Sequence, residues 1–175
     1  ASLLMASLQA SIRSMKERKN KPVAILEGLN DVMCDVMAID KFATMFYGCI
    51  QLGRNRLVYS NAGHFFPVIV SAEGDINQLD YSGLVLGVQR EFRYRTLKQK
   101  MDPGDMLVIT TDGVIEAEDE RGDLYGEERL HSFLSGMAGR SAREVRDAIA
   151  REVARFSAPG SARDDMTIMV IRRNE

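Results

Sequence analysis

The chain has 175 residues, a hydrophobic fraction of 45% and a formal net charge of −2 at pH 7, values that suit one globular domain with a sizeable core. Its charge balance favours neither nucleic acid nor a membrane as a partner, and no apolar run approaches the length that spans a bilayer. Two cysteines, Cys34 and Cys49, have neither zinc-ribbon spacing nor the number of a disulfide scaffold, which fits a reducing cytoplasm.

The first forty residues predict two helices. Apolar residues recur at helical spacing over 2–17 and again over 22–38, where Pro22 suits a first helical turn. Between them, "RSMKERKNK" at 13–21 is one locally basic stretch, which we interpret as a solvated helix end and connector. Because the first helical pattern is already complete at residue 3, we expect more of the same domain upstream.

After Asp40 the apolar pattern changes to that of strands. The "GRN" and "AEGD" turns predict two hairpins, and a nearly continuous apolar run is typical of a central strand buried on both faces. The segments predicted as strands are 42–52, 56–63, 66–71, 76–80, 91–100 and 106–113.

The remaining third of the chain predicts two helices and a last strand. The helices are expected over about 126–137 and 142–156, the second opened by a capping box of Ser141 and Glu144, and the strand over 166–173. The order of elements indicates an α+β fold with mostly antiparallel strands and helices packed on them.

Acidic residues stand at the ends of two apolar runs. Asp112 and Gly113 end the run at 106–113, and Asp164 and Asp165 precede the last strand. Each pair alone is compatible with an ordinary solvated turn. Together they are also compatible with a site for a hard divalent cation, because adjacent carboxylates repel unless they are screened and such cations prefer oxygen ligands. The residues alone leave both readings open and specify no reaction.

Five segments, taken in order, decide between these readings. They are "ASLLMASLQASIRS", "YSNAGHFFPVIV", "SGLVLGV", "VITTDGVIEAEDERGDLYGEERL" and "ARDDMTIMVIRR". Together they resemble the SpoIIE-type bacterial serine phosphatases of the protein phosphatase 2C-like, metal-dependent PPM family, over residues 1 to about 173. The resemblance implies a β-sandwich of two packed, mostly antiparallel sheets flanked by helices, an αββα arrangement.

The resemblance also implies chemistry. Family members hydrolyse phosphoserine or phosphothreonine with two Mn²⁺ or Mg²⁺ ions, whose bridging water attacks phosphorus. Asp112 and Asp164 match metal ligands of the family and are the expected catalytic, metal-binding residues. Gly113 and Asp165 are expected to support them from a second layer or to form the turns.

The Asn-Ala-Gly-His segment is expected on the substrate side of the site. It contains Asn61, Gly63 and His64. His64 is expected either to bond the substrate phosphate or only to shape its loop. Phe65 and Phe66 replace a proline-rich run common in the family, and Val85 replaces a common proline, so the shape of the substrate-side loops is expected to differ.

The family's first metal loop, with the Asp that bridges both ions, has no counterpart in residues 1–175. We therefore expect 1–175 to be the larger, C-terminal part of a catalytic domain that is N-terminally incomplete. By itself it is expected to be nearly inactive. Open sheet edges left by missing strands are expected to allow a homodimer.

The resemblance suggests partners as well. The expected substrate is a phosphorylated regulator of the anti-anti-sigma type, in sigma factor regulation and the stress response, with a sensor or regulatory domain upstream in the parent chain. The alternative is a non-catalytic module that binds a phosphoprotein or serves in assembly. The retained Asp112 and Asp164 favour the enzyme.

Overall fold

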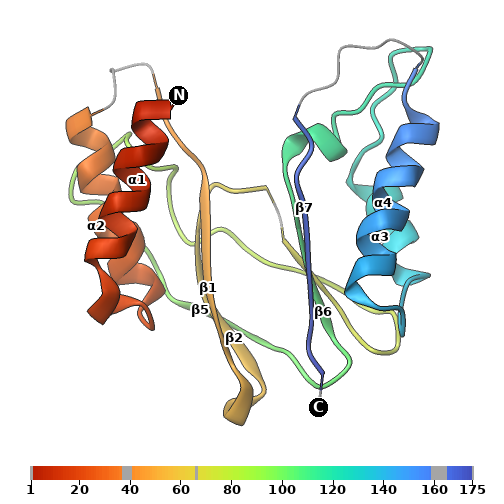
Figure 1. Cartoon of the computed structure of the whole chain (residues 1–175), viewed down its shortest axis with the longest axis horizontal. Helices are drawn as coiled ribbons and strands as arrows, with labels where there is room; N and C mark the ends of the chain where they lie inside the picture. Colours follow the sequence, from red (N-terminus) through yellow and green to blue (C-terminus); the bar gives the residue numbers. More distant parts are fainter. Residues whose placement is uncertain (1, 37–40, 66, 159–164, 175) are drawn as a thin grey trace. The chain divides into compact units, whose positions relative to one another are not determined.

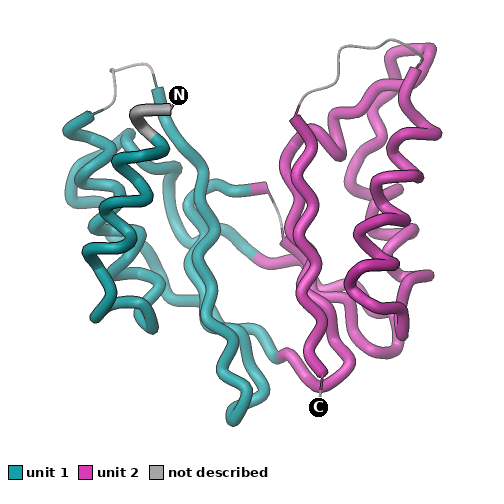
Figure 2. Tube along the Cα trace, in the orientation of Figure 1, with its two compact units in different colours: residues 1–64, 80–100 teal, residues 65–79, 101–175 magenta. Residues whose placement is uncertain are grey.

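The computed structural model describes residues 2–36, 41–65, 67–158 and 165–174. These residues form two compact units, shown in different colours in Figure 2. Within the described ranges, the helices are all too short or too polar to cross a membrane. Both units have the same plan, an antiparallel sheet with helices on one face, so the predicted α+β class with antiparallel sheets is confirmed.

Unit 1 consists of residues 1–64 and 80–100 and places two helices on a three-stranded sheet (Figure 1). Its elements are α1 (Ser2–Ser14), α2 (Pro22–Val36), β1 (Met45–Gln51), β2 (Arg56–Ala62) and β5 (Leu97–Lys100), with the short 3₁₀ turns η1 (Lys16–Arg18) and η2 (Leu52–Arg54). The sheet order is β1-β2-β5. Leu26 and Leu29 of α2 pack with Ala62 of β2 and with Leu86, and all four are fully buried.

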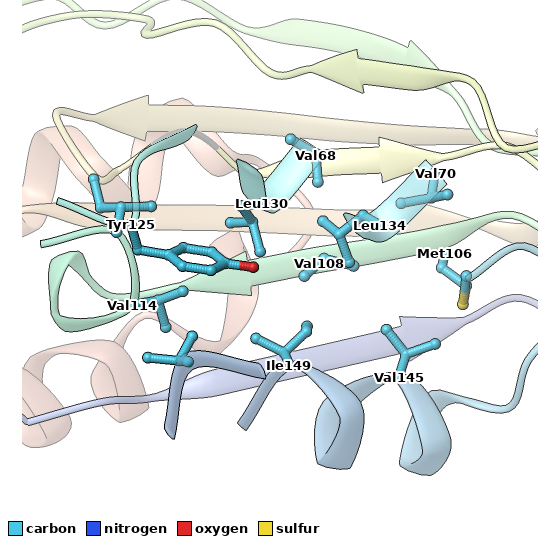
Figure 3. Close-up of a cluster of buried hydrophobic side chains, with 12 residues drawn as sticks. Val68, Val70, Met106, Val108, Val114, Tyr125, Leu130, Leu134, Val145 and Ile149 are labelled. Atoms are coloured by element: carbon cyan, nitrogen blue, oxygen red, sulfur yellow. The ribbon is translucent and has the colours of Figure 1, made fainter. Parts of the chain in front are cut away.

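Unit 2 consists of residues 65–79 and 101–175 and places two helices on a four-stranded sheet. Its elements are β3 (Val68–Val70), β4 (Ile76–Gln78), β6 (Met106–Thr110), α3 (Glu127–Ser135), α4 (Ala142–Phe156) and β7 (Ile168–Arg172), with the 3₁₀ turn η3 (Asp112–Val114). The sheet order is β4-β3-β6-β7, so β6 is the central strand that its apolar run predicts. Figure 3 shows α3 and α4 side chains, including Leu134 and Ile149, meeting Val108 of β6.

The predicted helices and hairpins are confirmed, with ends that shift by a few residues. β1 pairs with β2 and β3 with β4, both antiparallel. The capping box is present: the Ser141 hydroxyl accepts from the Glu144 backbone, and the Glu144 carboxylate accepts from the Ser141 backbone. These hydrogen bonds lower the pKa of Glu144.

One strand prediction is wrong in part, because only Leu97–Lys100 of the segment 91–100 is a strand. The loop before β5 is held instead by side chains of α2. The Asn30 amide donates to the Gln89 carbonyl at 2.8 Å, and the Asp31 carboxylate accepts from the Glu91 backbone at 3.1 Å. Glu91 has a φ of 56°, in the left-handed region that a strand does not adopt.

We predict that Ile149→Ala destabilises the protein by about 2–5 kcal/mol, because it opens a cavity in the core of unit 2. Ile149 is fully buried there. Arg151→Ala changes an exposed residue on the same helix and is expected to change stability by less than about 0.5 kcal/mol. Urea unfolding measures both values. Equal values for the two variants would show that α4 is not packed as described.

Candidate functional site

The end of β6 lies beside the beginning of β7, because the two strands are antiparallel and Thr110 pairs with Ile168. Thr111 continues this pairing beyond the strands. Its backbone N–H donates to the Thr167 carbonyl at 3.1 Å, and its hydroxyl accepts from the Thr167 N–H at 2.8 Å. The same hydroxyl donates to the Asp165 carbonyl at 3.1 Å. One threonine side chain therefore ties the Asp112 segment to the Asp165 segment.

Asp112 follows Thr111 and begins η3, with its side chain exposed. The Gly113 N–H donates to the Asp112 Oδ1 atom at 3.0 Å, and the Asp112 carbonyl accepts from Ile115 and Glu116 at 2.9 Å each. Val114 is fully buried and anchors the turn to the core. The chain therefore leaves the core in a tight turn that presents the Asp112 carboxylate to solvent.

The second predicted metal ligand, Asp164, lies outside the described residues, so its distance from Asp112 stays a prediction. Its neighbour Asp165 is described and exposed. Among the described residues, no three or more His, Cys, Asp or Glu side chains gather closely enough to hold a metal ion. The structure does bring the backbone of Asp165 next to the Asp112 turn, through the Thr111 hydroxyl, and both lie in unit 2.

Asn61, Gly63 and His64 form one closed loop in unit 1. The Asn61 side chain is buried, donates to the His64 carbonyl at 3.0 Å and accepts from the His64 N–H at 2.8 Å. Gly63 has a φ of 69°, and a Cβ atom there would lie 2.4 Å from the Val85 side chain. Only glycine fits this position without strain. Asn61 fixes the backbone of His64, and the imidazole Nδ1 lies 3.4 Å from the Thr44 hydroxyl.

Ser82 supports this loop from the neighbouring segment. Its buried hydroxyl accepts from the Asn61 N–H at 2.7 Å and lies 2.7 Å from the Ser60 hydroxyl. The Ser82 N–H donates to the Asn61 carbonyl at 2.9 Å. The roles of Ser82 and Thr111 were not predicted from the sequence. The available signal was a hydroxyl residue directly before a glycine or Asp-Gly turn, Thr111 before Asp112-Gly113 and Ser82 before Gly83.

A second acidic stretch, residues 116–123, follows Asp112, and its Asp119 stabilises a local turn. The Asp119 carboxylate accepts from the N–H groups of Arg121 at 2.8 Å and Asp123 at 3.0 Å. These backbone hydrogen bonds lower the pKa of Asp119. Glu118 and Leu124 form an antiparallel bridge that closes the loop. The Asp119 carboxylate therefore already accepts hydrogen bonds from two backbone N–H groups of its own turn.

The family described as Stage II sporulation protein E (SpoIIE) matches residues 1–174. The chain belongs to the SpoIIE family. This match, together with the relative RsbU, confirms the resemblance to SpoIIE-type phosphatases that the sequence motifs indicated.

Among curated relatives, the phosphoserine phosphatase RsbU of Bacillus subtilis (strain 168) is 29% identical over 174 residues. That alignment covers 99% of this chain and 51% of RsbU, so the chain spans about half the length of that relative.

Solved structures show the same fold. The SiaA-PP2C domain of Pseudomonas aeruginosa matches with a TM-score of 0.83 at 22% identity, over 99% of this chain and 68% of that one. The phosphatase domain of SpoIIE from Bacillus subtilis, presoaked with Mn, matches with a TM-score of 0.67 at 18% identity, over 94% and 73% of the two chains. The fold of this chain is therefore that of PP2C domains.

We predict that Asn61→Ala destabilises the protein by about 1–3 kcal/mol, because it leaves the His64 N–H and carbonyl without the partner that satisfies both. His64→Ala keeps those backbone bonds and is expected to cost less than about 1 kcal/mol. Urea unfolding of the two variants provides the comparison. A larger cost for His64→Ala would place the structural role in the imidazole instead.

Proposed function

We propose that residues 1–175 are the larger part of a metal-dependent serine/threonine phosphoprotein phosphatase domain of the SpoIIE type. The observation that carries this proposal is the β6–β7 end, where Thr111 ties the Asp112 turn to the Asp165 segment. Family membership and the PP2C fold support it. RsbU, a relative that matches nearly the whole chain, is named a phosphoserine phosphatase.

Asp112 and Asp164 are the proposed metal ligands. The donor chemistry fits, because an exposed carboxylate is the kind of ligand that Mn²⁺ and Mg²⁺ take. Such ions, when bound, make a coordinated water acidic enough to attack a phosphate ester. The chain's own contribution is orientation: the Gly113 N–H holds one oxygen of Asp112, and the Thr111 hydroxyl holds the carbonyl of Asp165, the residue that follows Asp164 in the sequence.

We further propose that two ions work together and that an upstream loop supplies the ligand they share. Without a shared anion, two neighbouring cations repel each other, so residues 1–175 alone are proposed to bind metal weakly and to be nearly inactive. Asn61, Gly63 and His64 are proposed to shape the substrate side, with His64 held through its backbone.

The proposed substrate is a phosphorylated regulator of the anti-anti-sigma type, met in the cytoplasm, with an upstream sensor domain that sets activity. These proposals rest on family resemblance. A non-catalytic phosphoprotein-binding module is the second candidate. Activity measurements separate the two.

We predict that, in a chain extended upstream to include the first metal loop, Asp112→Asn lowers kcat toward a small aryl phosphate by at least about 100-fold, because it removes a charged metal ligand. The measurement is steady-state hydrolysis in millimolar Mn²⁺. Asp123→Asn is the matched control, since it makes the same change on an exposed loop residue and is expected to leave kcat within about 2-fold.

The same assay on residues 1–175 tests the role of the upstream loop. The short chain is expected to show little activity beside the extended one. Equal loss of activity in both Asn variants, or full activity in the extended Asp112→Asn enzyme, would mean that the catalytic centre lies elsewhere. An inactive extended chain that still binds a phosphoprotein would favour the second candidate.

A further inference from the structure

Charge is segregated between the two units, although the whole chain is nearly neutral. Unit 1 contains 13 Lys and Arg residues against 7 Asp and Glu, whereas unit 2 contains 10 against 18. The net charge of −2 is therefore a cationic unit of +6 combined with an anionic unit of −8. A charge balance taken over the whole sequence hides this difference.

The basic turn between α1 and α2 is docked on the sheet of unit 1. The Lys19 carbonyl accepts from the Tyr47 hydroxyl at 3.1 Å and from the Cys49 thiol at 3.0 Å. Both donors belong to β1, so the turn at residues 16–21 lies against the helix side of the sheet. Only the backbone of Lys19 makes these bonds, which leaves the side chains of the turn exposed.

Strand register brings further cations to the same face. Cys49 pairs with Val58, and Val58 pairs with Lys98. Directly paired residues point to the same side of a sheet, and strands lie about 4.8 Å apart, so Lys98 emerges about 10 Å from Cys49 on the helix side. Arg56 and Lys100 pair two residues farther along these strands and point the same way.

We call this surface the basic face. It consists of Lys16, Arg18, Lys19, Lys21, Arg54, Arg56, Lys98 and Lys100. All are exposed except Arg56, which is half-buried, and Glu17 is the one acidic residue on the three segments that supply them. The basic face lies at the Arg56 end of β2, and the loop of Asn61, Gly63 and His64 lies at the other end of this strand.

An exposed leucine projects beside the basic face. Leu52 begins the η2 turn at the tip of the β1–β2 hairpin, and 63% of its surface is exposed. Asn55, with a φ of 47°, closes the turn. Figure 1 shows this tip and the α1–α2 turn toward the same, lower end of unit 1. Leu52 therefore presents apolar surface to solvent on the same turn as Arg54.

We propose that the basic face and Leu52 bind the surface of an anionic phospholipid membrane. Clustered lysines and arginines are attracted to anionic headgroups, and a projecting aliphatic side chain enters the boundary between headgroups and acyl chains. Five of the eight cations are lysines, and segments 16–21, 52–56 and 98–100 contain no aromatic residue. Single-stranded nucleic acid sites stack bases on aromatic side chains, so the composition favours lipid.

The test is sedimentation of the 175-residue chain with vesicles of phosphatidylcholine containing about 30% phosphatidylserine, at an ionic strength of about 0.1 M. We expect the chain to bind these vesicles and not pure phosphatidylcholine vesicles. Binding is expected to fall at least about 10-fold when the ionic strength is raised to about 0.5 M, because exposed charges are then screened.

The key variant combines Lys16→Glu, Lys19→Glu and Lys98→Glu, and its binding is expected to fall at least about 10-fold. The matched control combines Arg143→Glu, Arg146→Glu and Arg151→Glu on α4, which makes the same change in net charge at another surface. The control is expected to bind within about 2-fold of the unchanged chain. Leu52→Ser is expected to weaken binding by a few-fold without changing its salt dependence.

Circular dichroism establishes that each variant is folded. Equal loss of binding in the two triple variants would overturn the proposal, because it would show a response to net charge alone. Binding to pure phosphatidylcholine, no binding to either vesicle, or binding to single-stranded DNA in place of the anionic vesicles would overturn it as well. None of these outcomes depends on phosphatase activity, so the proposed function stands or falls separately.

Discussion

The antiparallel pairing of β6 with β7 is the constraint on which the candidate site depends. Thr111 and Asp165 are 54 residues apart in sequence, and this pairing puts them within one hydrogen bond of each other. Antiparallel strands place the end of one beside the beginning of the other. The Asp112 turn after β6 and the Asp165 backbone before β7 therefore lie at the same edge of the sheet of unit 2. The buried core beneath β6 keeps that pairing in register.

Both motif regions are held by a polar side chain that satisfies backbone groups. Thr111 does this for the segments around Asp112 and Asp165, and Asn61 does it for His64. Backbone groups need such partners wherever a strand ends and the ladder of hydrogen bonds stops. The result is a loop whose backbone is fixed before any ligand arrives. Prepositioned groups are what catalysis by a metal-bound water requires of its surroundings.

The sequence predicted the elements whose formation is local. Alternating apolar residues and turn residues identified the hairpins, and the apolar run before Asp112 identified the central strand. It failed at 91–96, because the conformation of that segment depends on side chains of α2, including Asn30 and Asp31. A distant helix can override local strand propensity, and no pattern within the segment records it.

The candidate site, like the fold, was predictable from the sequence only in part. The place of Asp112 after an apolar run was identifiable from the sequence, and its role as a metal ligand is a proposal that rests on the family resemblance. The contributions of Thr111 and Ser82 were not, because each works through a backbone group that only the fold brings near. The basic face was hidden for another reason: net charge averages over two units of opposite sign, whereas a partner meets one surface at a time.

The most direct test of the shared edge is a titration of the ¹⁵N-labelled chain with Mn²⁺, followed by amide NMR. A paramagnetic ion broadens the signals of nearby amides, so the pattern of loss locates the ion without any activity measurement. The structure predicts that amides of residues 111–116 and 165–167 broaden together and first. Broadening centred on the acidic turn at 119–123, with 111–116 unaffected, would contradict the assignment of Asp112 to the metal centre.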